Sequence, residues 1–100
     1  MIQIIALLYA GHGGREALKA YETEVLPILH EHGGRLISAS RPSEPRDDDP
    51  DEIHIVHFPD MAALTAFRAD PRHVALKPRR TDALRDVRLY ITDQFVTYID

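Results

Sequence analysis

One stretch, residues 52–70, constrains the fold most, because it combines a strand, a sharp turn and a helix in direct succession. Glu52–Phe58 is rich in β-branched and aromatic residues, which predicts a strand. Pro59 ends that strand because it has no N–H to donate to a sheet, and Asp60 is suited to cap a helix. The apolar residues at positions 63–67 then recur on one side of a helical wheel. We therefore expect a helix that runs to about Ala69 and folds back on the strand.

The first third of the chain predicts a second strand and helix. Ile2–Ala10 is apolar on both of its faces, which indicates a central strand with other groups packed on each side. A helix is expected from about Arg15 to His32, with Tyr21 on its apolar stripe. Pro27 falls on the solvent side of this helix, where it bends the helix around the core. Gly33-Gly34 predicts a left-handed helix end.

The remaining segments complete the expected element order. Arg35–Arg41 is a weaker strand, and the proline- and aspartate-rich segment Pro42–Asp51 predicts a solvated hairpin loop. His73–Leu84 predicts a helix or two short turns. Asp86–Ile99 predicts a long last strand with a bulge or bend near Asp93.

The order β-α-β-β-α-β, with right-handed crossovers, predicts an α+β fold of the ferredoxin-like type. In this arrangement a four-stranded antiparallel sheet carries both helices on one face. The whole chain, residues 1–100, is expected to form one domain. An exposed apolar sheet face exceeds what soluble monomers tolerate. We therefore expect a homodimer, sheet against sheet, with the C-terminal strand reaching the partner, which is a dimeric α+β barrel.

Composition excludes several classes of function. The net charge of −4 provides no electrostatic footprint for nucleic acid or an anionic membrane. No apolar run approaches the ~20 residues of a membrane span, and the start of the chain lacks the basic region of a signal peptide. The absence of cysteine excludes disulfides and thiolate metal sites, and it fits a reducing, cytoplasmic location.

Six histidines raise the question of a metal site, but their spacing argues against one. His54 and His57 are three apart on a strand and point to opposite faces, and His30 and His32 lie far apart around a helix. Neither pair has the spacing of metal ligands within one element, so we expect no metal, and a site built from three elements is the alternative. His32, at the end of the first helix, is assigned a capping role.

Four short motifs add a family resemblance. They are Leu26-Pro27 followed by His32-Gly33-Gly34-Arg35, the corner Phe58-Pro59-Asp60, Phe67 ahead of Asp70-Pro71, and Lys77-Pro78-Arg79-Arg80. With them the chain resembles the dimeric α+β-barrel superfamily, specifically its small bacterial branch related to antibiotic-biosynthesis monooxygenase and EthD-like proteins. The resemblance implies a homodimer with a pocket between the sheet and the helices of each subunit. Relatives often have an aromatic residue at the position of His73, and Arg80 occupies the position of their usual arginine.

His54 and Arg80 are the candidate catalytic residues. His54 shares a strand face with Phe58, so it is expected to face the helix-side pocket, where an imidazole can act as acid or base. The alternative is a core histidine whose hydrogen bonds are satisfied. Arg80 can clamp a carboxylate or enolate, or it is a surface arginine paired with Asp82 or Asp86.

Tyr21, His73 and Phe67 are the candidate ligand-binding residues. Tyr21 is expected in the pocket wall or as a core aromatic residue, and His73 is expected to orient an anion together with Arg80. By resemblance, the chemistry is cofactor-independent oxygenation, or isomerisation through an enolate, of a small organic ligand. The alternative is a non-enzymatic dimer that binds a ligand or a partner protein, and fold alone does not separate the two.

Overall fold

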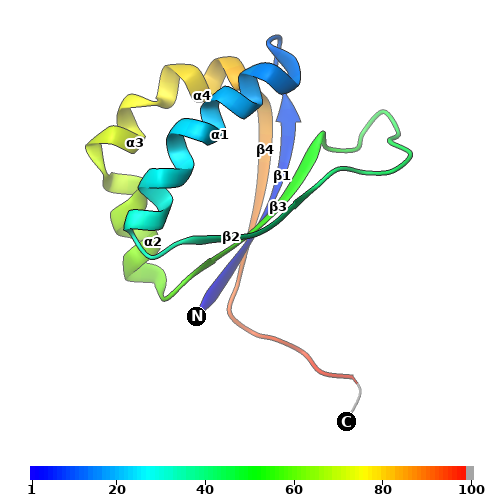
Figure 1. The fold of residues 1–100 in the computed structure, drawn as a ribbon. Helices are drawn as coiled ribbons and strands as arrows, with labels where there is room; N and C mark the ends of the chain where they lie inside the picture. The colour runs from blue at the N-terminus through cyan, green and yellow to red at the C-terminus, as the bar shows by residue number, and fades with distance from the viewer. Residues whose placement is uncertain (99–100) are drawn as a thin grey trace.

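The computed structural model describes residues 1–98 and has two layers, an antiparallel sheet and a set of helices on one of its faces (Figure 1). The sheet order is β2-β3-β1-β4, which confirms the predicted ferredoxin-like class. The elements are β1 (Ile2–Ala10), α1 (Gly14–Glu31), β2 (Arg35–Ser40), β3 (Glu52–Phe58), α2 (Met61–Ala69), α3 (Pro71–Ala75), α4 (Lys77–Ala83) and β4 (Leu84–Thr92). None of these helices is both long and apolar enough to cross a membrane.

The turn from β3 into α2 forms as the sequence predicts. The Asp60 side chain accepts a hydrogen bond of 2.8 Å from the backbone N–H of Ala63, which satisfies one of the free donors of the first turn. Phe58, the last residue of β3, is only 1% exposed and packs against Phe67 of α2, with ring centroids 5.6 Å apart. The helix therefore folds back on the strand that precedes it.

The end of α1 is a Schellman motif. Gly33 has φ of +79°, and its N–H donates to the carbonyl of His30 at 3.0 Å. The N–H of Gly34 donates to the carbonyl of Leu29 at 2.9 Å, which completes the pattern. Pro27 is exposed, as predicted from its place on the helical wheel.

The segment between α2 and β4 contains two short helices. Of the two predicted forms, one helix or two short turns, the structure has the second. α3 ends at Ala75, and α4 begins at Lys77, one residue before Pro78. The carboxylate of Asp70 accepts a hydrogen bond of 2.9 Å from the Arg72 N–H and thus caps α3.

The prediction of a strand over Asp86–Ile99 is wrong at its C-terminal end. β4 ends at Thr92, and residues 93–98 form neither strand nor helix and run away from the sheet (Figure 1). Ile99 lies outside the described residues. The physical reason is that β4 is an edge strand whose neighbour is β1. Thr92 pairs with Gln3, and β1 begins at Ile2, so the residues beyond Thr92 have no strand left to pair with.

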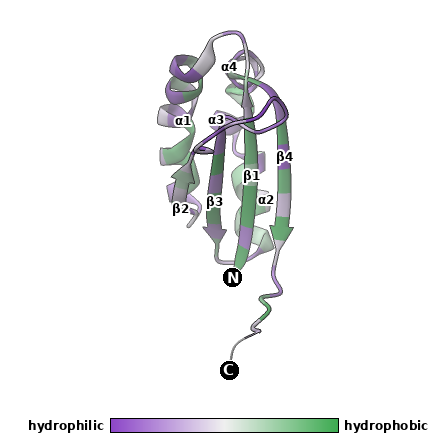
Figure 2. Cartoon of the chain, turned by 90° about the vertical axis from the view of Figure 1, so that its right-hand side faces the viewer, coloured by the Kyte–Doolittle hydropathy of each residue, from purple (hydrophilic) through white to green (hydrophobic). Residues whose placement is uncertain are grey.

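The two faces of the sheet have different surroundings. The helix side carries the core, and within the described residues no helix covers the opposite side, which we call the open face and which Figure 2 shows with the helices behind it. Ile5 and Tyr90 are paired in register on the open face, and Tyr90 is 55% exposed. The other half-buried apolar residues of this face are Leu7, Ile53 and Ile55.

The loop at residues 41–51 is anchored at its C-terminal end. Asp51 accepts a hydrogen bond of 2.7 Å from the Ala10 N–H through its side chain, and its own N–H donates to the Leu8 carbonyl at 2.8 Å. The Tyr9 hydroxyl donates to the Asp48 carbonyl at 3.4 Å, which helps to bury Tyr9 at one end of the open face. The rest of the loop is largely exposed, as predicted for a solvated hairpin connection.

Candidate functional site

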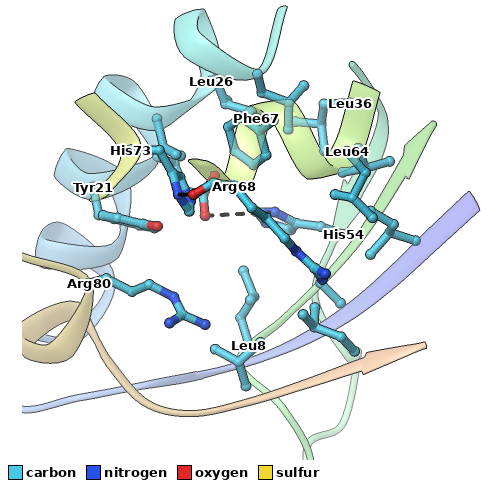
Figure 3. Close-up of a pocket in the computed structure, with 18 of the residues that line it drawn as sticks. Leu8, Tyr21, Leu26, Leu36, His54, Leu64, Phe67, Arg68, His73 and Arg80 are labelled. Atoms are coloured by element: carbon cyan, nitrogen blue, oxygen red, sulfur yellow. Dashed lines mark hydrogen bonds and ion pairs between the residues drawn. The ribbon is translucent and has the colours of Figure 1, made fainter. Parts of the chain in front are cut away.

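A cavity of about 380 Å³ lies between the helices and the sheet (Figure 3). This volume is within the range of sites that bind small molecules. All five residues that the sequence analysis singles out line it, namely Tyr21, His54, Phe67, His73 and Arg80. They come from α1, β3, α2, α3 and α4, so the fold brings together side chains from five separate elements.

The walls of the cavity are mainly apolar. Phe58, Leu64 and Phe67 belong to these walls and leave the space between them open. Further apolar walls are contributed by Ile4, Ala6, Leu8, Val25, Leu26, Leu29, Leu36, Val56, Leu84, Val87 and Leu89. A ligand that fits must therefore have a hydrocarbon body and only a few polar groups.

His54 is buried, and its two nitrogens face two carboxylates. Its side chain is 7% exposed, and its Nε2 lies 2.8 Å from Oε1 of Glu52. Its Nδ1 lies 4.0 Å from Oε1 of Glu22 on α1. The structure thus combines the two predicted alternatives, since this histidine is hydrogen-bonded in the core and also lines the cavity.

The pKa values of the two carboxyl groups next to His54 are shifted in opposite directions. Burial raises the pKa of Glu22, as does the neighbouring Glu52, while the positive form of His54 lowers it in part. For Glu52 burial acts in the same direction, but hydrogen bonds from His54 and Arg41 outweigh it and lower the pKa. Glu52 is therefore the carboxylate that stays ionised and fixes the imidazole.

Glu22 and Glu52 were not predicted as site residues. Glu52 precedes His54 by two residues on the same strand, so strand periodicity places both side chains on one face and provides a signal for the pair. Glu22 follows Tyr21 at the edge of the apolar stripe of α1, but its contact with His54 depends on how α1 packs over β3. No local pattern in the sequence contains that information.

Arg80 points its guanidinium into the cavity (Figure 3). Within residues 1–98 its guanidinium makes no hydrogen bond or ion pair, so the predicted alternative of a pair with Asp82 or Asp86 is wrong for these residues. Its neighbour Arg79 is paired with Glu24 on the surface, and Asp86 is 3.7 Å from Arg88. Arg80 therefore contributes a positive charge to a mainly apolar cavity that Glu22, His54 and Arg68 also line.

His73 and Phe67 form one wall of the cavity, with ring centroids 4.4 Å apart. Nδ1 of His73 lies 3.4 Å from the Arg68 carbonyl oxygen. Burial is the main cause that lowers the pKa of His73, and the charge of Arg80 adds to it. His73 is thus a neutral, polar group beside a cation at neutral pH.

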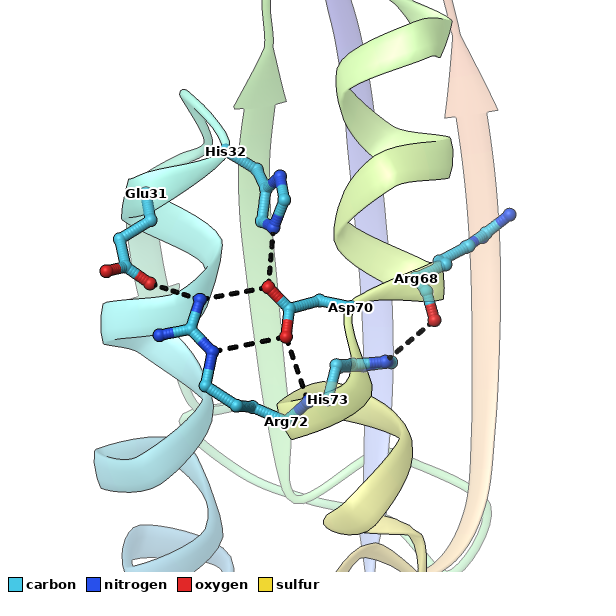
Figure 4. Close-up of polar contacts among 6 residues, drawn as sticks. All are labelled: Glu31, His32, Arg68, Asp70, Arg72 and His73. Atoms are coloured by element: carbon cyan, nitrogen blue, oxygen red, sulfur yellow. Dashed lines mark hydrogen bonds and ion pairs between the residues drawn. The ribbon is translucent and has the colours of Figure 1, made fainter.

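A polar cluster outside the cavity positions α3 (Figure 4). The Asp70 carboxylate lies 2.9 Å from His32 Nε2 and 2.9 Å from the Arg72 guanidinium, and Arg72 also contacts Glu31 at 2.5 Å. These contacts connect the end of α1 to the start of α3, which carries His73. His32 therefore has a structural role, in which its side chain links the end of α1 to Asp70 and not to the carbonyl groups of its own helix.

His57, the other histidine of β3, lies outside the cavity. His57 faces the opposite side of the sheet, where its Nε2 lies 3.0 Å from Oε1 of Gln3 within the same chain. Among residues 1–98, no group of three or more His, Asp or Glu side chains is arranged to hold a metal ion.

Comparison with solved structures shows the same fold in other bacterial proteins. A protein of unknown function from Rhodopseudomonas palustris is 23% identical with a TM-score of 0.79, and the match covers 96% of this chain and 83% of that chain. An uncharacterized NIPSNAP domain protein from Burkholderia xenovorans is 20% identical with a TM-score of 0.75, over 100% of both chains. A DABB family protein with a ferredoxin-like fold from Mesorhizobium loti is 19% identical with a TM-score of 0.70, over 95% of this chain and 97% of that chain.

At these identities the structural similarity concerns the fold alone. Among curated proteins, no sequence matches the chain significantly. The family model described as "Domain of unknown function (DUF1330)" matches residues 10–95, which include all five cavity residues named above. Because this match extends over most of the chain, the protein belongs to the DUF1330 family.

Proposed function

We propose that the protein binds a small organic acid or enolisable carbonyl compound in the cavity and moves a proton on it, with His54 as the base. One observation carries this proposal. A buried imidazole, held by a carboxylate at 2.8 Å, and a guanidinium with no carboxylate partner among residues 1–98 line the same apolar cavity. Such a combination of an acid–base group and a cation suits a ligand that develops negative charge on oxygen.

The proposed reaction is a proton transfer that needs no cofactor. His54 Nδ1 takes a proton from the carbon next to a carbonyl group, and the electron pair of that C–H bond moves onto the carbonyl oxygen. Arg80 stabilises the resulting enolate, because a guanidinium binds oxyanions with two parallel hydrogen bonds. Return of the proton to a different carbon completes an isomerisation. The Tyr21 hydroxyl and His73 orient the polar end of the ligand.

Cofactor-independent oxygenation is the second reaction that the site supports. It begins with the same proton abstraction, after which the carbanion reacts with molecular oxygen as a second substrate. The apolar walls favour it, since they keep water from such an intermediate. Consumption of oxygen in the presence of a phenol or enolisable substrate distinguishes it from isomerisation.

Ligand binding is tested by thermal shift with a panel of small keto acids, phenols and quinones, since a ligand specific for the native state raises the melting temperature. We expect a keto acid to stabilise the wild-type protein, and Arg80→Gln to weaken that binding by about tenfold, as for the loss of one charge-assisted contact. Arg79→Gln is the matched control, because its side chain lies outside the cavity lining. The proposal fails if no compound of the panel shifts the wild type.

Proton transfer is tested separately, by exchange of the keto acid's α-hydrogens with deuterium oxide followed by NMR. His54→Asn is expected to slow this exchange by about 100-fold or more, the usual contribution of a general base. Binding by the wild type without any exchange would support the alternative, a non-enzymatic ligand-binding protein.

We further propose that the protein is a homodimer formed through the open face. The support is the apolar character of this face together with Phe95, Val96 and Tyr98 in the segment after β4, which are 57%, 70% and 92% exposed. Exposed apolar surface of this kind is typical of interfaces. A second copy provides an identical apolar sheet to cover it. Sedimentation at micromolar concentration is expected to yield twice the 11.4 kDa mass of one chain.

A further inference from the structure

A second cavity, of about 410 Å³, lies on the other side of the Glu22–His54 pair. Four residues line both cavities, namely Glu22, Leu26, Leu36 and His54. The second cavity is otherwise lined largely by exposed, charged side chains, which include Arg15, Glu16, Lys19 and Arg41. The pair therefore forms part of the wall between an apolar cavity and a charged one next to solvent.

A row of polar groups passes through this wall, with hydrogen bonds from Arg41 through Glu52 to His54 and a separation of 4.0 Å between His54 and Glu22. Arg41 donates to Oε2 of Glu52 at 3.0 Å, and Oε1 of Glu52 lies 2.8 Å from Nε2 of His54. Because the Glu52 carboxylate is ionised, it can only accept a hydrogen bond, so Nε2 of His54 must carry the hydrogen. In neutral His54 the Nδ1 atom then has a free lone pair, and it faces Oε1 of Glu22 at 4.0 Å.

We propose that Glu22 and His54 form a proton relay between the two cavities, in which Glu22 exchanges the proton with solvent through the second cavity. A proton that Nδ1 has taken from the ligand passes to the Glu22 carboxylate, which leaves His54 neutral, and Glu22 then releases it to water. Return of the proton follows the same path in reverse. The use of the relay in catalysis rests on the function proposed above, but the relay itself is present without ligand.

The charged groups around the pair suit this role. They are Glu22 from α1, Glu52 from β3 and Arg41 from β2, with Arg68 of α2 and Arg80 of α4 in the lining of the first cavity and Arg15, Glu16 and Lys19 of α1 in that of the second. Arg41 and Glu52 neutralise one another, so the imidazole can gain or lose a proton on the Nδ1 side alone. The raised pKa of Glu22, caused mainly by burial, brings this carboxyl group closer to the titration range of an imidazole.

Electrostatic coupling of the pair is tested by NMR titration of the Glu22 carboxyl carbon in the ligand-free protein, with Glu22→Gln to identify its signal. We expect His54→Asn to shift the Glu22 titration to higher pH, because an imidazolium no longer stabilises the carboxylate. His57→Asn is the matched control, since His57 lies on the same strand with its side chain on the opposite face, and it should leave the titration unchanged. An identical Glu22 titration in all three proteins would overturn the relay. His54→Gln replaces His54→Asn if the latter does not fold.

The route to solvent is tested through Ala39, which lines the second cavity and not the first. Ala39→Trp is expected to slow, several-fold, the exchange with water of the proton that Nδ1 carries when His54 is protonated, as measured by NMR. Ile37→Trp, an exposed neighbour outside both linings, is the control. Unchanged exchange in Ala39→Trp would overturn the proposed route. Both measurements need no ligand, so a failure of the relay is distinguishable from the absence of keto acid binding.

Discussion

Nε2 of His32, one residue beyond the end of α1, lies 2.9 Å from Oδ2 of Asp70, the residue that caps α3. This contact joins two segments that are 38 residues apart in the sequence. Asp70 also holds Arg72, so one carboxylate fixes the relative positions of α1 and α3.

The first prediction concerns acid stability. Hydrogen bonds from Arg72, and then from His32, hold the pKa of Asp70 well below its ordinary value of 3.8. The unfolded chain therefore binds this proton more readily than the native protein, and the stabilisation by Asp70 is complete above the unfolded pKa and decreases as the pH falls below it. We expect Asp70→Asn to lower the melting temperature above about pH 5, with the difference from wild type decreasing below about pH 4.

Thermal melting of both proteins between neutral and acidic pH checks this expectation. Asp60→Asn is the matched control, because Asp60 caps α2 and makes no ion pair with any of residues 1–98, and Asn caps a helix about as well as Asp. Equal melting temperatures of wild type and Asp70→Asn at neutral pH would contradict the structural role of Asp70.

The second prediction concerns His73. Burial lowers the pKa of His73 in the native protein below the ordinary value of 6.5, which applies to the unfolded chain. Between the native and the unfolded pKa, the unfolded chain therefore binds a proton at His73 that the native protein does not bind. The native state therefore loses stability as the pH falls through this window. His73→Phe retains the ring packed on Phe67 but cannot titrate, so we expect it to gain stability relative to wild type as the pH is lowered from about 7 to about 5. Urea unfolding at several pH values measures this, and parallel pH profiles would exclude the interpretation.

The third prediction concerns Gly33. Its φ of +79° is unfavourable for a residue with a Cβ atom, and a Cβ at this position would lie 3.1 Å from Cγ of Pro59. We expect Gly33→Ala to destabilise the protein by about 1–2 kcal/mol, the usual cost of this backbone conformation. Gly33→Asn should cost less, because Asn tolerates the left-handed region better. Chemical denaturation of the three proteins ranks them, and an Ala variant as stable as wild type would show that the motif at the end of α1 rearranges.

The fourth prediction concerns the proposed dimer. Tyr90 is exposed on the open face, so Tyr90→Lys places a charge in the proposed interface without disturbing the core of one subunit. We expect this variant to sediment as a monomer at concentrations where the wild type is a dimer. Ala20→Lys, at an exposed position of α1, is the matched control and should leave the dimer intact. A wild-type protein that sediments as a single chain would disprove the dimer.

Local signals in the sequence were sufficient for most of the fold. Pro59 and Asp60 mark the start of α2, and the Gly33-Gly34 pair marks the end of α1, because their backbone chemistry acts over a few residues. The end of β4 depends instead on where its neighbour β1 begins, and the register pair of Gln3 and Thr92 joins positions that are 89 residues apart. A strand-like composition after Thr92 could not reveal that no pairing partner remained.

The candidate site was predictable where the position of a side chain follows from the pattern of its own helix or strand. The alternation of β3 placed His54 on the helix side, and the family resemblance indicated Arg80. The second carboxylate of the site, Glu22, was not predictable, because its distance to His54 depends on the packing of a helix against a strand 32 positions away in the chain. Chemistry that depends on such contacts requires the three-dimensional structure.

The anchoring of Asp51 to both Leu8 and Ala10 has a practical consequence. These bonds fix the alignment of β1 and β3 independently of the exposed residues 43–46 that precede them. A peptide tag or a fluorescent label inserted there should therefore leave the sheet and both cavities intact. This hairpin offers a handle for immobilising the protein or for following it by optical methods.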